Sequence, residues 1–350
     1  MKRWRTGPAD IRLMVAAGVW SAWALGRVHA RRAFDLRGKT VLITGGSRGL
    51  GLVLARQVLT EGGLVAICAR EHETLDRARE LLETPGSEVL AVPCDVTDRA
   101  SVQQMLDTVR QHFGPVDVLI NNAGVIEVGP AETMSVADYD EAMATNFWGM
   151  LYPTLAVLPG MKERRTGRIV NITSIGGKLG LPHLLPYTAS KFAAVGFSQG
   201  LRVEVAPYGV KVVTVVPGLM RTGSPRNAIF RGKHRSEYAW FSISDSLPGL
   251  SVSAESAARR IIAACRRGDA EALFPIPARI AAVINAVAPG LTSQVLTLVE
   301  RLLPGPSDQP RGRRMGSESQ SRFSPSWLTR LGDSAARKYN QIAPAGGASK

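Results

Sequence analysis

Short apolar runs alternate with helical patterns along the middle of the chain. The first run, Thr40 to Thr44, is rich in β-branched residues, and after a glycine-rich stretch a helical pattern extends from Leu50 to Glu61. β-Branched runs favour strands, and apolar positions recurring every three to four residues favour helices. The alternation continues with predicted strands at 64–69, 88–93, 116–120, 168–172 and 211–216, and with predicted helices at 73–83, 101–113, 136–155 and 187–206.

This alternation predicts one α/β domain, spanning about residues 38–270, with a doubly wound parallel sheet and helices on both of its faces. The predicted strands are nearly continuous apolar runs, as expected where helices cover both faces of a sheet. The predicted architecture is therefore a Rossmann fold, in which ligands bind beyond the carboxyl ends of the strands.

The N-terminal segment, residues 1–37, has a different pattern. Basic residues flank an apolar run from Leu13 to Gly26, which is shorter than the roughly 20 residues that a membrane-spanning helix needs. Three interpretations stay open: a helix lying in the membrane interface with tryptophan anchors, a helix packed on the protein's own surface, and a signal peptide cleaved near Ala30. The charges on both sides favour the interfacial helix, and thus peripheral contact with a membrane.

The C-terminal part also departs from the central pattern. Within residues 271–303, two apolar helical segments, Ala278 to Ala288 and Leu291 to Leu303, are separated by Pro289-Gly290, and neither is long enough to span a bilayer. Residues 304–350 are rich in Pro, Gly, Ser and Arg, which predicts a disordered basic tail.

Positive charge is concentrated at the two ends of the chain. The net charge is +14, but residues 1–37 hold eight basic and two acidic residues, and residues 304–350 hold eight and three. The central domain is therefore nearly neutral, and the ends lack aromatic residues in a repeated register, which counts against nucleic-acid binding. Basic ends on a nearly neutral domain suit an anionic membrane surface.

The chain has three cysteines, Cys68, Cys94 and Cys265, without CxxC pairing or metal-ligand spacing. An odd number with members in predicted strands indicates reduced thiols in a protein core. We therefore expect a cytoplasmic protein, at most peripheral on the membrane face, without a metal site.

A glycine-rich loop joins the first strand to the first helix. Its sequence is Thr44-Gly45-Gly46-Ser47-Arg48-Gly49-Leu50-Gly51, a TGxxxGxG pattern. Glycines let the backbone turn tightly and approach a pyrophosphate, and the helix that follows directs its N-terminal N–H groups at the phosphates. We expect a dinucleotide to contact Gly45, Ser47, Arg48, Gly49, Leu50 and Gly51.

The second strand ends at Ala69-Arg70, with no acidic residue at that position. An acidic residue there binds a ribose 2′-hydroxyl, whereas a basic residue accommodates a 2′-phosphate. Arg48 supplies a second positive charge, so the sequence predicts NADP(H) as the cofactor.

Polar residues also follow the third and fourth strands. Cys94-Asp95-Val96 comes after the third strand, where the carboxylate can accept a hydrogen bond from an adenine amino group, and Asn121-Asn122-Ala123-Gly124 ends the fourth. Both lie at the carboxyl ends of strands, where open α/β sheets bind ligands. The predicted cofactor site therefore also contains Asp95, Val96, Asn122, Ala123 and Gly124.

The candidate chemistry lies on one predicted helix. Tyr187 and Lys191 are four residues apart and project from the same helix face. An ordinary tyrosine pKa near 10 is too high for efficient proton transfer at neutral pH, and a nearby ammonium lowers it. Ser174, just after the fifth strand, adds a hydroxyl at the same edge of the sheet.

Over about residues 38–225, these motifs together resemble the short-chain dehydrogenase/reductase family. The glycine-rich loop, the Asn-Asn-Ala-Gly sequence, Asn146, the Ser-Tyr-Lys set and Pro217-Gly218 occur in the family's order and spacing. The resemblance implies NADP(H)-dependent oxidoreduction between a carbonyl and an alcohol.

The resemblance also implies roles for individual residues. Tyr187 would be the general acid for reduction and the base for oxidation, and Ser174 would bind the substrate carbonyl. Lys191 would hold the nicotinamide ribose and lower the pKa of Tyr187, and Asn146 would position a proton-relay water. Tyr187 and Lys191 would thus also contact the cofactor, and its nicotinamide and phosphates would be bordered by Pro217, Gly218 and Thr222.

The predicted substrate region is apolar, which favours a lipophilic carbonyl or alcohol. It comprises Gly176 to Pro186 and the stretch after Thr222, which includes Ile229, Phe230, Tyr238, Trp240 and Phe241. We expect His183, in the first of these segments, to face solvent rather than to act as a base. An alternative function is a non-enzymatic NADP(H) sensor or scaffold, although a sensor would not require the complete tetrad. We expect a homodimer or homotetramer.

Overall fold

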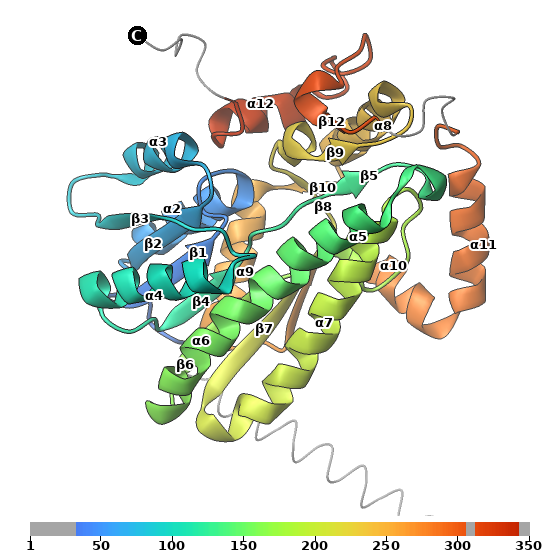
Figure 1. Ribbon diagram of the computed structural model, residues 1–350. Helices are drawn as coiled ribbons and strands as arrows, with labels where there is room; N and C mark the ends of the chain where they lie inside the picture. The colour runs from blue at the N-terminus through green and yellow to red at the C-terminus, as the bar shows by residue number, and fades with distance from the viewer. Residues whose placement is uncertain (1–32, 306–311, 343–350) are drawn as a thin grey trace, which may run out of the picture.

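A seven-stranded parallel sheet forms the centre of the computed structural model, which describes residues 33–305 and 312–342 (Figure 1). The strand order is β11-β7-β6-β4-β1-β2-β3. These strands are β1 (Thr40–Thr44), β2 (Leu64–Ala69), β3 (Val89–Pro93), β4 (Val118–Asn121), β6 (Gly167–Ile172), β7 (Val210–Pro217) and β11 (Glu271–Phe274). The order reverses between β1 and β4, and ligands of such sheets bind at the carboxyl ends of the strands flanking this point. The predicted doubly wound fold is confirmed.

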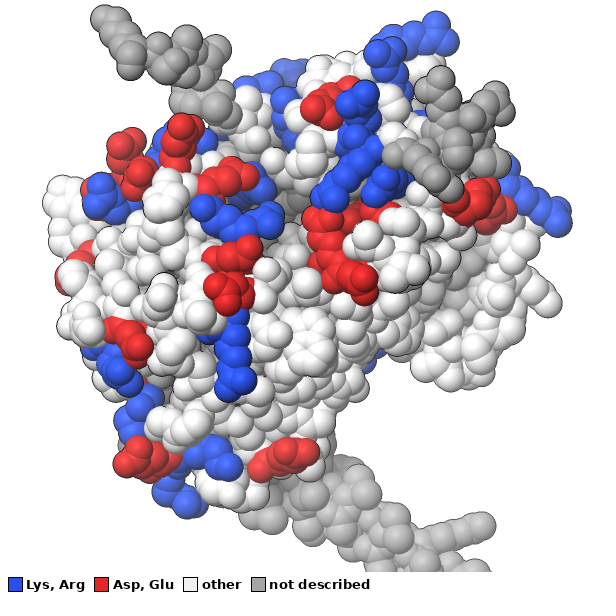
Figure 2. Space-filling view, in the orientation of Figure 1, with Lys and Arg blue, Asp and Glu red and all other residues white. Residues whose placement is uncertain are grey.

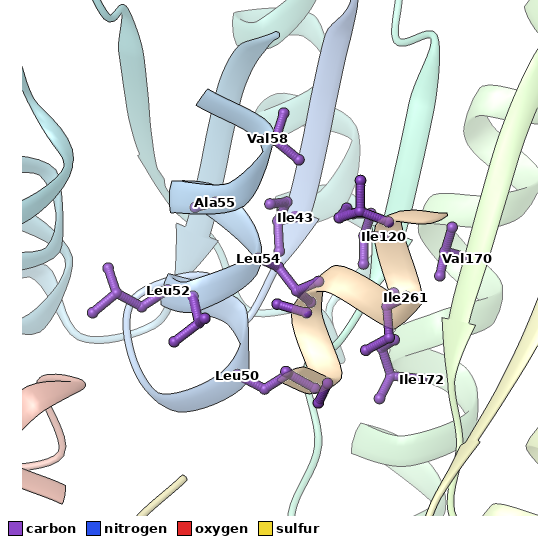
Figure 3. Close-up of a cluster of buried hydrophobic side chains, with 14 of the residues drawn as sticks. Ile43, Leu50, Leu52, Leu54, Ala55, Val58, Ile120, Val170, Ile172 and Ile261 are labelled. Atoms are coloured by element: carbon purple, nitrogen blue, oxygen red, sulfur yellow. The ribbon is translucent and has the colours of Figure 1, made fainter. Parts of the chain in front are cut away.

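Helices cover both faces of the sheet. One face carries α2 (Gly49–Thr60), α3 (His72–Leu82) and α9 (Ala254–Arg267), and the other carries α4 (Arg99–Phe113), α6 (Gly149–Glu163) and α7 (Leu185–Val205). Because successive strand residues point to opposite faces, Ile43 packs under α2 and α9 while Leu42 packs on the other side. Figure 3 shows the first of these clusters, with Leu54 and Ile261 among the side chains between the helices and the strands.

The folded domain extends beyond both predicted boundaries. Leu36 is buried in the core, and the N–H of Phe34 donates to the carbonyl oxygen of Arg266 at 2.8 Å, so residues 33–37 belong to the domain. At the other end, β11 pairs with β7 as far as Phe274, past the predicted end at 270. This strand is only four residues long, too short for its pattern to stand out in the sequence. The apolar run at 13–26, with its three interpretations, lies outside the described residues.

The predicted helix at 136–155 is longer and interrupted. The structure has α5 (Val136–Met143), the π-helical turn η2 (Ala144–Trp148) and then α6, which continues to Glu163. A π turn inserts an extra residue into the helical repeat and is frequent at functional sites. Here it carries Asn146, whose side chain is buried.

A helical hairpin follows the sheet on one side of the domain (Figure 1). It consists of α10 (Ile276–Val287) and α11 (Pro289–Glu300), close to the two predicted apolar helices. Ala278 is the buried residue of α10, and α11 has none. In the described ranges, no helix is both long enough and apolar enough to cross a membrane.

Residues 312–342, which we call the strap, fold against the carboxyl ends of the strands. Within the strap, β12 (Arg314–Met315) pairs with β9 (Ile229–Phe230), which pairs with β5 (Glu127–Val128), and α12 (Arg330–Lys338) follows. The prediction of a disordered tail is therefore wrong for these residues. Their polar composition gives little apolar surface to bury, but the strap is held by hydrogen bonds to the domain, which composition does not reveal.

Shorter elements complete the fold. They are α8 (His234–Ser246), β8 (Leu219–Arg221), β10 (Ser251–Ser253) and the 3₁₀ turns η1 (Ala131–Thr133), η3 (Ile175–Gly177), η4 (Ala206–Tyr208), η5 (Ser224–Asn227) and η6 (Gly316–Glu318). Because β8 pairs with β10, the segment after β7 is held beside the strand ends.

Candidate active site

A cavity of about 550 Å³ lies at the carboxyl ends of the strands. Its lining includes every residue that the sequence predicts for cofactor binding or catalysis except Gly51. A Cβ atom on Gly51 would lie 2.2 Å from the carbonyl oxygen of Gly45. Gly51, in the first turn of α2, therefore allows the glycine-rich loop to pack closely against this helix, although it does not itself line the cavity.

The loop after β4 braces the glycine-rich loop. The side-chain amide of Asn122 donates to the carbonyl oxygens of Thr44 at 3.1 Å and Gly45 at 2.9 Å. The backbone N–H groups of Asn122 and Ala123 donate to the Thr44 hydroxyl at 3.0 and 3.1 Å. Gly45 and Gly49 have φ angles of 62° and 56°, in the left-handed region that glycine tolerates. The loop thus forms a cradle at the start of α2, which suits a pyrophosphate.

Two arginines lie at the end of the cavity next to β2. Arg48 is 3.7 Å from the carboxylate of Glu71, and Arg70 is an exposed residue of the same rim. Burial lowers the pKa of Arg48, Glu71 opposes that shift, and the charge of Arg70 adds to it. The two guanidinium groups are therefore close enough to repel each other. An anion bound between them would reduce this repulsion.

Asp95 lies beside this end of the cavity. Its Oδ1 accepts hydrogen bonds from the backbone N–H of Thr97 at 2.9 Å and from its hydroxyl at 2.8 Å, which orients the carboxylate. Cys68 and Cys94 line the same wall, and all three cysteines are free and buried. Among residues 33–305 and 312–342, no group of three or more His, Cys, Asp or Glu side chains is arranged to hold a metal ion.

The catalytic candidates meet at the other end of the cavity. The Lys191 ammonium donates to the carbonyl oxygen of Ile172 at 3.1 Å and lies 5.7 Å from the centroid of the Tyr187 ring. Burial lowers the pKa of Lys191 to about 8. Burial also raises the pKa of Tyr187, which a hydrogen bond with Ser174 partly offsets.

Burial raises the pKa of Tyr187 in this structure, whereas the resemblance implies that Lys191 lowers it. The ammonium is directed at the Ile172 carbonyl rather than at the phenol oxygen, and the loss of water around the phenol is the larger effect. Tyr187 therefore holds its proton firmly at neutral pH, as a general acid for reduction must before it reacts.

Asn146 ties the π turn to two other parts of the site. Its Oδ1 accepts from the N–H of Val125 at 3.1 Å, while its Nδ2 donates to the Val125 carbonyl and to the Ser190 hydroxyl, each at 3.0 Å. Ser190 in turn donates to the carbonyl oxygen of Tyr187 at 2.8 Å. Asn146 thus fixes the loop after β4 relative to the first turn of α7.

Comparison with known proteins identifies the family. The family model described as short chain dehydrogenase matches residues 39–229, more than half of the chain. This protein belongs to the short-chain dehydrogenase family.

Several named relatives and solved structures are similar to this chain. The chain is 34% identical over 267 residues to an Anopheles gambiae protein named dehydrogenase/reductase SDR family protein 7-like, covering 75% of this chain and 83% of that protein. It is 36% identical over 214 residues to the 3-ketodihydrosphingosine reductase of Mus musculus, covering 59% and 64%. Among solved structures, levodione reductase has a TM-score of 0.59 at 26% identity, covering 69% of this chain and 96% of that one.

As a member of this family, the chain is an oxidoreductase that acts on CH–OH groups with NAD(P) as acceptor. The matched region ends at residue 229. The hairpin of α10 and α11 and the strap both lie beyond it, so the family match does not account for either of them.

His183 is buried in the structure, although the sequence predicts that it faces solvent. It is buried, with a left-handed φ of 59°, and its Nδ1 is 3.0 Å from the Glu237 carboxylate. Trp240 donates to the same carboxylate at 2.6 Å. The prediction that His183 faces solvent is wrong, because a partner 54 residues away supplies the polar contact that lets it be buried.

Several cavity residues were not found from the sequence. Asp245 on α8 accepts from the N–H of Met220 at 3.1 Å, while its other oxygen is buried without a hydrogen-bond partner among the described residues. Burial raises its pKa to about 7. The strap contributes Arg313, Met315 and Gln341 to the cavity lining. None belongs to a motif, so no sequence signal pointed to them.

Proposed function

We propose that this dehydrogenase uses NADP(H) to interconvert a lipophilic carbonyl compound and its alcohol. The observation that carries the cofactor choice is the pair of guanidinium groups, Arg48 and Arg70, on the rim of one cavity end. The contact between Arg48 and Glu71 involves side chains that are 33% and 62% exposed. Such an exposed pair is worth at most about 1 kcal/mol, so a 2′-phosphate can displace it.

The cofactor, when bound, supplies or accepts the hydride. Tyr187 donates its phenolic proton to the carbonyl oxygen in reduction and takes it back in oxidation, and Ser174 hydrogen-bonds to the same oxygen. Lys191 holds the nicotinamide ribose, and its positive charge stabilises the phenolate that Tyr187 becomes. Asn146 holds the backbone at Val125 in place and orients the water that relays a proton back to the site.

The substrate class is supported by the other wall of the cavity. Apolar side chains line it, from the loop after β4, the segment before α7, β9 and α8; they are Ile126, Leu181, Leu184, Ile229 and Phe241. An apolar lining with few polar groups favours an apolar ligand oriented by those groups. The relative named 3-ketodihydrosphingosine reductase supports the same class.

Turnover of a substrate panel tests this function. Lipophilic ketones and aldehydes and small polar ketones would be incubated with the full chain and NADPH, and oxidation of NADPH followed by absorbance. We expect turnover with the lipophilic members and little with the polar ones. Tight binding of NADPH without turnover of any member would instead favour the sensor or scaffold. Turnover restricted to polar members would contradict the substrate class.

We also propose that the protein contacts a membrane peripherally from the cytoplasmic side. The hairpin supports this, because large aliphatic side chains project from both of its helices; Val287 is 80% exposed and Leu302, just beyond α11, is 86% exposed. Figure 2 shows that the face over α10 and α11 carries few charged residues. Exposed apolar surface of this kind marks interaction sites, and the basic N-terminal sequence suits anionic lipid.

Flotation with anionic liposomes tests the membrane contact. The full chain would be compared with a variant carrying Val283→Glu and Leu298→Glu on the hairpin, and with a chain starting at Leu36. We expect the full chain to float and each variant to float less. Flotation of the full chain should weaken in high salt, because salt screens the attraction between its basic residues and anionic lipid. Equal flotation of all three, or of none, would contradict the proposal.

A homodimer or homotetramer is the assembly we propose. Large apolar side chains are exposed along η2, α6 and α7, namely Trp148, Leu155, Phe192 and Val203. Light scattering after size exclusion tests this, with Phe192→Glu as the variant. We expect a dimeric or tetrameric mass that falls toward the monomer in the variant, and a monomeric mass for the unaltered chain would contradict it.

A further inference from the structure

The last residues of the strap are bonded directly to the glycine-rich loop. The N–H of Gly49, at the start of α2, donates to the carbonyl oxygen of Tyr339 at 2.9 Å. The side-chain amide of Asn340 donates to the carbonyl oxygens of Ser47 and Thr74, each at 2.9 Å. Asn340 has a φ of 57°, a conformation that asparagine adopts more readily than most residues. This end of the strap is therefore fitted closely to the loop that is to cradle the pyrophosphate.

Gln341 continues from there to the opposite wall of the cavity. Its Nε2 donates to the carbonyl oxygen of Thr222 at 3.1 Å, and its Oε1 accepts from the side-chain amide of Asn227. The same Nε2 lies 2.7 Å from where a Cβ atom of Gly49 would be. Gln341 thus touches the glycine-rich loop on one side and the segment after β8 on the other, and it lines the cavity between them.

The rest of the strap is fixed at several points. Arg313 forms a two-fold ion pair with Glu141 of α5 at 2.7 and 2.8 Å, and both residues line the cavity. Lys338 pairs with Glu255 of α9, and α12 lies across the strand ends between α3 and α8 (Figure 1). Gln341, by contrast, comes after the end of α12 and is held to the far wall by two neutral hydrogen bonds. Its side chain can release without unfolding the helix.

We propose that the Gln341 side chain is a latch that must open for NADP(H) to enter or leave the cavity. This inference rests on the proposed function, because it concerns the same cavity and its dinucleotide. The latch bonds join protein to protein, so we expect them to form equally with and without the dinucleotide. A contact made equally in both states changes the rates of binding and release but leaves the affinity unchanged.

Stopped-flow fluorescence of NADPH with the full chain tests the latch. The variant Gln341→Ala removes both bonds to Thr222 and Asn227, and Gln320→Ala is the matched control, because Gln320 is an exposed glutamine of the same strap. Two neutral hydrogen bonds correspond to roughly a tenfold change in rate. We expect association and dissociation rates both to rise about tenfold in Gln341→Ala, with Kd within about twofold of the unaltered chain, and no change in Gln320→Ala.

A double-mutant cycle with Asn227→Ala sharpens the test, because Asn227 holds the other half of the latch. If the latch exists, each single variant speeds exchange, and the double variant exchanges hardly faster than Gln341→Ala. Unchanged rates in Gln341→Ala would overturn the latch, as would a weaker Kd with an unchanged association rate, which would indicate a direct contact with the cofactor. Failure of the unaltered chain to bind NADPH would overturn the proposed function instead.

Discussion

The two ends of the cavity are built in different ways. At the catalytic end, Asn146, Ser174 and Lys191 are at most 7% exposed, and each is hydrogen-bonded to backbone or buried side chains. At the nucleotide end, the Arg48 side chain is 33% exposed, Arg70 is exposed, and the ion pair of Arg48 with Glu71 spans 3.7 Å.

The difference separates chemistry from recognition. The catalytic side chains are fixed by the protein core before any ligand arrives, so removal of the reacting hydroxyl of Tyr187 changes the rate of reaction without a large change in cofactor affinity. The arginines are solvated and adjustable, so their removal changes which cofactor binds. Each prediction below tests one side of this division.

The largest effect is expected from Tyr187→Phe. The substitution keeps the ring that packs in the cavity and removes the proton donor, so kcat should fall at least 100-fold, within the contribution of about 10² to 10⁴ that general acid catalysis makes. Steady-state kinetics with a substrate from the panel measures kcat, and fluorescence titration measures the Kd for NADPH, which should stay within about threefold. An active Tyr187→Phe variant would refute the mechanism. A large loss of NADPH affinity would refute the separation of the two ends.

The next largest effect concerns cofactor choice. Replacing Arg48 and Arg70 together with Ala removes two charged partners of a 2′-phosphate, each worth about 1.5 kcal/mol or more. Because both side chains are partly solvated, we expect about 100-fold weaker NADPH binding and less than threefold change for NADH. Calorimetric titration with both cofactors measures this, with Arg79→Ala, an exposed arginine of α3, as the control. Equal losses for NADPH and NADH would show that the arginines do not read the 2′-phosphate.

The sequence predicts the region up to β7 well and the region beyond it poorly, for a physical reason. In the first region the inner strands bury both faces, as with Val41 and Leu42, and most motifs follow directly on a strand end. Local patterns therefore carry the fold and bring Ser174, Tyr187 and Lys191 to one edge. The strap is held by contacts such as Asn340 with Ser47, across 293 positions of sequence. Asp245 and His183 are hydrogen-bonded to partners 25 and 54 positions away, and no local pattern encodes such contacts.

A smaller effect, on stability, is expected at the catalytic end. Lys191 is 4% exposed and its pKa is lowered from 10.5 to about 8. Below pH 8 the folded chain bears the full penalty of a buried charge, and between pH 8 and 10.5 that penalty disappears as Lys191 loses its proton in the folded chain first. Lys191→Met should therefore raise the free energy of unfolding by about 2 kcal/mol at pH 7, and less as the pH approaches 10.

Denaturant unfolding at pH 7 and pH 10 measures this gain, and activity assays should show that the same variant is inactive. The matched variant at the nucleotide end is Arg48→Met, for which we expect a change within about 0.5 kcal/mol because its side chain is partly solvated. A destabilised Lys191→Met would mean that Lys191 is stabilising where it lies, and a gain that grows with pH would contradict a lowered pKa of Lys191.

The smallest expected effect is a pH dependence of cofactor affinity. Asp245 lines the cavity with one oxygen unpartnered among the described residues, and burial raises its pKa to about 7. Below pH 7 it is neutral, and above pH 7 its negative charge shares the cavity with the phosphates of the dinucleotide. Titration with NADH, which lacks the 2′-phosphate and its own ionisation near neutral pH, should show affinity falling about threefold from pH 6 to pH 8, a modest loss in keeping with an effective interior dielectric near 20. Asp245→Asn keeps an oxygen to accept from Met220 and should abolish the fall while leaving affinity at pH 6 unchanged. The same fall in both proteins would assign it to another group.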